Sequence, residues 1–117
     1  MIAVAVAIAA VLQPASPSPA TLDLEGAYIG WTHCLSAQER LADPETPARR
    51  VADAAVRACE PLQRELIAAH EAWLAVSNLG ERDRERDRRG LVRFIRDVRA
   101  NVLNVVRDMR RSLPPHR

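Results

Sequence analysis

The sequence predicts an all-α fold, a small antiparallel three-helix bundle in which a disulfide-linked helical hairpin packs against an Arg-rich C-terminal helix. Three observations support it. The chain has 117 residues, the length of one small domain. Its hydrophobic residues are mainly Ala, Val and Leu, with only two Trp, one Tyr, one Phe and four Gly, a composition that favours helices. Apolar residues recur at spacings of three and four over long stretches, which is the period of a helix face.

Residues 1–20 are typical of a secretory signal peptide. The apolar run MIAVAVAIAAVL is too short for a membrane-spanning helix, which needs about 20 apolar residues, but it fits the apolar core of a signal. Ser18 and Ala20 place small residues at the −3 and −1 positions. We therefore expect cleavage after Ala20 and a single periplasmic or secreted helical domain over residues 21–117. The alternatives are a disordered Ala/Pro leader and a short anchor retained at the membrane.

The first helix is expected over residues 22–42, with Thr21 or Asp23 as its cap. Gly26, Gly30 and Cys34 are four residues apart, so they lie near one face, where the glycines would allow a second helix to approach. The alternative is that the helix begins later, near Trp31. The positions that follow a helical period are Leu24, Ala27, Tyr28, Trp31, Cys34, Leu35, Leu41 and Ala42.

The second helix is expected over residues 47–78, after a turn at residues 43–47 (DPETP) in which two prolines end one helix and start the next. Pro61 lies inside this helix and predicts a kink, because proline removes one backbone hydrogen bond. The apolar positions form an a/d seam of the kind found in coiled coils: Ala48, Ala52, Ala55, Cys59, Leu62, Leu66, Ala69, Trp73 and Val76.

A charged linker is expected over residues 79–90, because the stretch ERDRERDRR has no apolar residue and its favourable and unfavourable charge spacings roughly cancel. The third helix is expected over residues 91–113, where Pro114 and Pro115 follow. Its apolar seam is Leu91, Ile95, Val98, Val102, Val105 and Met109, broadened by Phe94 and Val106.

Cys34 and Cys59 are predicted to form a disulfide. They lie at similar distances on either side of the turn, so an antiparallel hairpin brings them to the same height, and an exported chain meets an oxidising compartment. The alternatives are a redox-active pair, a soft-metal site completed by His33 and His70, and two free thiols.

The sequence predicts no enzyme, no catalytic residue, no metal site and no cofactor. The pair His70-Glu71 begins a zinc-protease motif, but Leu74 stands where its second histidine belongs. There is no glycine elbow around a serine and no glycine-rich phosphate loop.

Charge is distributed unevenly along the chain. Residues 21–80 carry five arginines and nine acids, whereas residues 81–117 carry twelve arginines and six acids. An amphipathic basic helix binds anionic lipid or lipopolysaccharide headgroups, and the alternative is an ordinary solvated surface. Export and the scarcity of aromatic residues argue against nucleic acid as a partner. The candidate anion-binding residues are Arg93, Arg96, Arg99, Arg107, Arg110 and Arg111.

The chain also resembles a known group of proteins. Tyr28, Cys34 and the segment Ala54-Ala55-Val56-Arg57-Ala58-Cys59, followed by a helix and an Arg-rich C-terminal helix, are similar to small exported two-cysteine helical proteins of sphingomonad-type alphaproteobacteria, which are uncharacterised. The resemblance runs from about residue 22 to the end. It implies an exported helical protein with one disulfide.

Two functional hypotheses follow. The first is a non-enzymatic periplasmic interaction or envelope-support module that holds a protein partner through a partly open apolar seam. The second is a protein that binds an anionic membrane surface through the arginines of its C-terminal helix. The sequence leaves the oligomeric state open.

Overall fold

The computed structural model describes residues 18–112, which form four α-helices and no strand. They are α2 (Pro19–Leu41), α3 (Ala48–Ala58), α4 (Glu60–Val76) and α5 (Glu81–Ser112). The all-α class is confirmed. The expected three-helix count is wrong, because the helix predicted over residues 47–78 is divided into α3 and α4. The expected signal peptide lies outside the described residues except for its last three positions.

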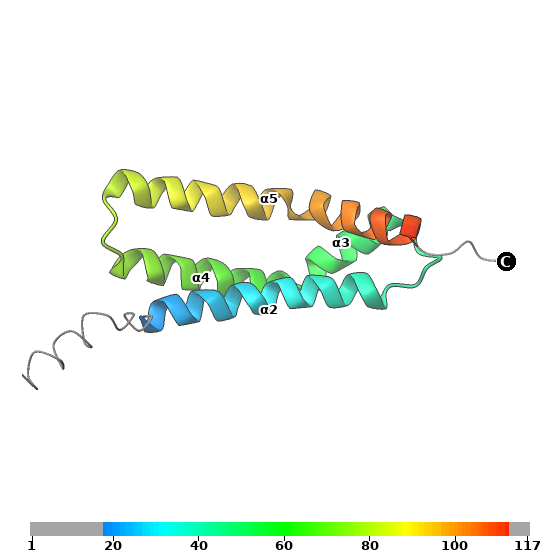
Figure 1. Cartoon of the computed structure of the whole chain (residues 1–117), viewed down its shortest axis with the longest axis horizontal. Coiled ribbons are helices and arrows are strands. Elements are labelled where there is room, and N and C mark those ends of the chain that lie inside the picture. Colours follow the sequence, from blue (N-terminus) through cyan, green and yellow to red (C-terminus); the bar gives the residue numbers. More distant parts are fainter. Residues whose placement is uncertain (1–17, 113–117) are drawn as a thin grey trace, which may run out of the picture.

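The four helices form an elongated bundle (Figure 1). Helices α2 and α5 run in the same direction, and the α3–α4 segment runs back between their ends. Helix α2 packs along α4 and also against α3, while α5 packs mainly on α3 through its C-terminal half. Helices α2 and α5 contact each other over a much shorter stretch. Contact between α4 and α5 is shorter still, so the first half of α5 is the least closely packed part of the bundle.

One apolar core joins α2, α3, α4 and α5. Trp31 is its largest side chain and is 1 % exposed, and Leu66 of α4 is buried to the same extent. The ring of Trp31 lies edge-on to Phe94 of α5, with ring centroids 5.8 Å apart. The buried residues of this core are Trp31, Leu35, Val51, Ala52, Ala55, Cys59, Leu66, Val98, Val102 and Val106.

Helix α2 begins earlier than expected. Ser18 caps it by accepting a hydrogen bond from the Thr21 N–H at 3.2 Å, and Pro19 occupies the first turn, where its missing N–H costs nothing. The cap is therefore neither Thr21 nor Asp23. The expected cleavage after Ala20 would fall within this first turn, so cleavage would remove the cap but none of the buried residues.

The turn between α2 and α3 lies where the sequence places it. The Asp43 side chain accepts a hydrogen bond from the Glu45 N–H at 2.9 Å, and the Thr46 N–H bonds to the Asp43 carbonyl at 3.0 Å. Pro47 is the N-cap residue, and α3 begins one residue later than expected.

The kink expected near Pro61 is a complete break at Cys59. Cys59 ends α3 and also precedes the first residue of α4, with φ −96° and ψ 5°, outside the helical region. Pro61 lies in the first turn of α4, a position that proline tolerates. Pro61 is thus the second residue of a new helix that begins at Glu60, after the old one has ended at Ala58.

The linker expected over residues 79–90 is wrong from residue 81 onward, because α5 already begins at Glu81. Glu81 and Asp83 stabilise the positive end of the helix. Contacts to α4 then hold the first turns: Arg88 binds Glu71 at 2.8 Å, and Arg84 donates to the Ser77 carbonyl at 3.4 Å. Charge spacing within the stretch could not reveal these contacts to another helix.

The apolar seam of α5 shifts after Val102. Val98, Val102 and Val106 are buried, whereas Val105 is 41 % exposed and Met109 is 38 % exposed. The buried positions thus continue at a spacing of four, not at the alternation of four and three that a coiled coil needs. Val105 and Met109 are left on the side of α5 that is turned toward α2.

The two glycines of α2 do not mediate close helix packing. A Cβ atom built on Gly26 or Gly30 meets nothing within 4 Å. The expected glycine-lined approach beside Cys34 is wrong, and the helix runs through both glycines without an early break.

Candidate functional site

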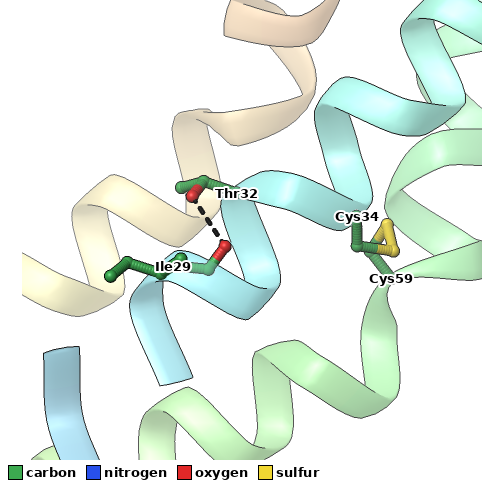
Figure 2. The surroundings of a disulfide bond; sticks show 4 residues. All are labelled: Ile29, Thr32, Cys34 and Cys59. Atoms are coloured by element: carbon green, nitrogen blue, oxygen red, sulfur yellow. Dashed lines mark hydrogen bonds between the residues drawn. A yellow bond between two sulfur atoms is a disulfide. The ribbon is translucent and has the colours of Figure 1, made fainter. Parts of the chain in front are cut away.

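The predicted disulfide between Cys34 and Cys59 is confirmed (Figure 2). The Cα atoms are 5.8 Å apart, within the range usual for disulfides. Cys34 lies in the middle of α2, and Cys59 is the single residue between α3 and α4, fully buried. The bond therefore links α2 to the bend itself and not to the middle of a helix.

The surroundings of the disulfide are typical of a structural bond and not of a redox-active one. Two residues before Cys34, the Thr32 hydroxyl lies 3.1 Å from the Ile29 carbonyl (Figure 2) and 3.0 Å from the Tyr28 carbonyl, so it bonds within its own helix. Cys59 is packed in the apolar core. A buried sulfur surrounded by apolar side chains is typical of a structural disulfide, whereas redox-active cysteines are partly exposed and beside positive charge.

The histidine and cysteine side chains are not gathered into a ligand set. Within residues 18–112, no three His, Cys, Asp or Glu side chains lie close enough together to hold a metal ion. Both thiols are used in the disulfide. The ring of His70 stacks on Trp73 of the same helix, with centroids 6.0 Å apart.

The six candidate arginines divide into two groups. Arg99 and Arg110 bind within the chain: Arg99 pairs with Asp53 of α3, and Arg110 donates to the Thr46 carbonyl at 2.5 Å. They fix α5 to α3 and to the α2–α3 turn. The remaining four, Arg93, Arg96, Arg107 and Arg111, are exposed on the opposite side of α5.

These four belong to a longer row, which we call the outer arginine face. Its first five members follow spacings of four, three, four and three, so they lie on one side of the helix, opposite Val98 and Val102. The row is about 21 Å long over these five residues, at 1.5 Å per residue. The outer arginine face consists of Arg82, Arg86, Arg89, Arg93, Arg96, Arg107 and Arg111, all exposed.

The outer arginine face is only lightly neutralised. Arg96 pairs with its neighbour Asp97 at 3.2 Å, and Arg111 pairs with Asp108 at 2.7 Å, both on α5 and both well exposed. Exposed pairs of this kind contribute little free energy, so they leave an arginine available to an outside anion. The structure shows no ion pair for the other five members within residues 18–112.

Sequence reasoning missed three members of this face, Arg82, Arg86 and Arg89. They lie in the expected linker, in which no common face exists. Their spacing to Arg93 and Arg96 was readable from the sequence, but it gains meaning only once the helix is known to begin at Glu81.

Two ion pairs hold α5 to the rest of the bundle, Asp53 with Arg99 and Glu71 with Arg88. The hydrogen bond from Arg99 lowers the pKa of Asp53, and the hydrogen bond from Arg88 lowers the pKa of Glu71. The positive charge of each arginine also lowers the pKa of the carboxylate that it contacts. Both carboxylates are thus favoured in their charged form where α5 docks.

Comparison of the chain with protein-family models, with curated proteins and with solved structures found no match. No helix within the described range, residues 18–112, is both long and apolar enough to cross a membrane.

Proposed function

We propose that this chain is an exported, non-enzymatic helical module of the cell envelope, which attaches to an anionic surface of lipid or lipopolysaccharide headgroups through the outer arginine face of α5. The observation that carries the proposal is the alignment of seven exposed arginines along one side of a single 32-residue helix. The opposite side of that helix is held to α3 by Val98, Val102 and Arg99. The arginines are therefore presented along one continuous helix that is anchored to α3.

Export is supported by the disulfide and by the signal-like residues 1–20. A buried disulfide persists in an oxidising compartment, which for an exported bacterial protein is the periplasm or the outside. The resemblance to small exported two-cysteine proteins points the same way. The absence of an enzymatic role is proposed on the sequence, which carries no catalytic motif.

The attraction between the arginines and an anionic surface sets the size of the expected binding free energy. Each arginine near an anionic membrane surface contributes about 1 kcal/mol, an attraction that salt screens. Replacing five members of the face should therefore weaken binding on the order of a thousandfold. A control variant is needed to show that the loss of binding comes from this face and not from the change in net charge alone.

The chain supplies a matched control. One variant replaces Arg82, Arg86, Arg89, Arg93 and Arg96 by Gln. The other replaces the five arginines of the α2–α4 region by Gln, and all of these are exposed: Arg40, Arg49, Arg50, Arg57 and Arg64. The two variants lose the same charge from different sides of the molecule.

The test is co-sedimentation of the full chain with phosphatidylglycerol vesicles and with phosphatidylcholine vesicles, at low and high salt. We expect salt-sensitive binding to the anionic vesicles that is lost in the α5 variant and kept in the control. Equal loss in both variants would reduce the effect to net charge, and no binding to anionic vesicles by the unaltered chain would end the proposal.

A further inference from the structure

A second surface of the molecule lies between α2 and α5 and is apolar. Tyr28 is 45 % exposed, Phe94 and Val105 are each 41 % exposed, and Met109 is 38 % exposed. We call these four residues the apolar strip. Tyr28 and Phe94 lie together at one end of the strip, and Val105 and Met109 lie at the other end, about three turns further along α5.

The strip follows from the helix geometry. Helices α2 and α5 run in the same direction (Figure 1). The rings of Tyr28 and Phe94 are 6.3 Å apart. Phe94 and Val105 are eleven residues apart, about three full turns, so they lie on the same side of α5. The strip is about 22 Å long from Phe94 to Met109, enough for four turns of another helix.

A cavity of about 230 Å³ lies at one end of the strip. Ala42, Pro44, Val106 and Met109 supply its apolar wall, and Glu39, Arg40 and Arg110 also line it. Arg110 is already bound to the carbonyls of the α2–α3 turn. The cavity has room for one long side chain beside Glu39.

Acidic residues border the strip. Glu25 precedes Tyr28 by one turn of α2, Glu39 follows Tyr28 by three turns, and Asp87 precedes Phe94 by two turns. None of the three makes an ion pair within the part of the chain that the structure describes. Partial burial raises the pKa of Glu39, an effect that Arg40 partly offsets.

From this juxtaposition we propose that the apolar strip is the docking site for an amphipathic helix of a partner protein, one whose apolar stripe is flanked by lysines or arginines. Charge decides between occupants. The three acids Glu25, Glu39 and Asp87 distinguish a lipid surface from a basic helix. An anionic membrane would be repelled by the same three acids, whereas a basic helix would neutralise them. The outer arginine face lies on another side of α5 and would stay free.

The test uses the full chain and a synthetic peptide of about 18 residues, with leucines at alternating spacings of three and four and lysines beside them. A second peptide has glutamates in place of the lysines. Affinities are measured by calorimetry. One protein variant combines Glu25→Gln, Glu39→Gln and Asp87→Asn, and its control makes the same charge change elsewhere with Asp23→Asn, Glu45→Gln and Glu65→Gln.

We expect the lysine peptide to bind at least about tenfold more tightly than the glutamate peptide, a preference that the Glu25/Glu39/Asp87 variant loses and the control keeps. A Val105→Asn variant should also weaken binding, with an unchanged circular dichroism spectrum. Equal affinity for both peptides, or no binding of the lysine peptide at about 1 mM, overturns the proposal.

Two further outcomes would also overturn it by assigning another occupant. A concentration-dependent dimer that Val105→Asn dissociates would place a second copy of the chain on the strip. Loss of vesicle binding in the Val105→Asn variant would place lipid there.

Discussion

Cys34 is bonded to Cys59 at the one residue where the returning half of the hairpin bends, so a single covalent bond fixes both the pairing of α2 with the α3–α4 segment and the position of the bend. Because Cys59 is fully buried, the bend also belongs to the core. Helix α5 packs on α3, the helix that precedes this bend.

Removing the disulfide should destabilise the fold markedly. Cys34 and Cys59 are 25 residues apart in sequence, and closing a loop of that size reduces the entropy of the unfolded chain by an amount worth about 3–4 kcal/mol. We expect the Cys34→Ala, Cys59→Ala double variant to lose about this much free energy of unfolding in urea titrations. The oxidised and reduced forms of the unaltered chain serve as the control pair. A double variant as stable as the oxidised protein would show that the bond constrains nothing.

Trp31 should be the most costly single core residue to truncate. Its side chain is 1 % exposed and contacts the aromatic rings of Tyr28 and Phe94. Trp31→Ala should cost about 3–5 kcal/mol in the free energy of unfolding, and Trp31→Phe should cost less, because it keeps an aromatic contact to Phe94. Val76→Ala, at a position that is 65 % exposed, is the matched control and should have little effect.

The docking of α5 should weaken in acid. The pKa values of Asp53 and Glu71 are lowered from ordinary values of 3.8 and 4.5, so folding favours their charged forms. Their contribution to stability is complete above those ordinary values and is lost as the pH falls through the lower pKa values of the folded state. Unfolding measured between about pH 6 and pH 2 should show this decline.

The matched variants isolate the two carboxylates. Asp53→Asn with Glu71→Gln should flatten the acid decline, whereas Glu45→Gln, in the α2–α3 turn, should leave it unchanged. An equally steep decline in the Asp53/Glu71 variant would assign the acid sensitivity to other groups.

Glu39 should behave in the opposite sense. Burial raises its pKa above the ordinary value of 4.5, so its contribution is favourable below that value and is lost as the pH rises through the folded-state pKa. Glu39→Gln should therefore stabilise the free protein slightly at pH 7, by less than roughly 0.5 kcal/mol, and the gain should vanish near pH 4. A Glu39→Gln protein that is less stable at pH 7 would contradict this.

Local features of the sequence were enough to predict the helical class, the turn at residues 43–47 and the Cys34–Cys59 pair. Each depends on information close in sequence: helical spacing, proline before a turn, and equal distances from that turn. Pro61 likewise predicted a kink in the helix, although the chain bends at Cys59.

What could not be predicted depends on contacts between helices. The stretch after residue 80 is helical, and besides its pair with Glu85 on the same helix, Arg88 reaches Glu71 on α4, a partner 17 residues away in sequence. The burial of Val106 in place of Val105 depends on how α5 crosses α3, since a helical period of 3.6 drifts away from a repeat of seven. Because of the first error, the sequence did not predict the first half of the outer arginine face. Because of the second, it did not predict the second half of the apolar strip.

The proposed envelope surface and periplasmic setting both depend on the proposal of export, and one measurement tests that proposal directly. The intact mass of the protein recovered from its own cells is determined before and after reduction and alkylation. We predict a chain that begins at Thr21 and is two hydrogens lighter than its reduced form, with alkylation at Cys34 and Cys59 only after reduction. A chain that keeps residues 1–20 and has two free thiols would contradict export and the oxidised state together.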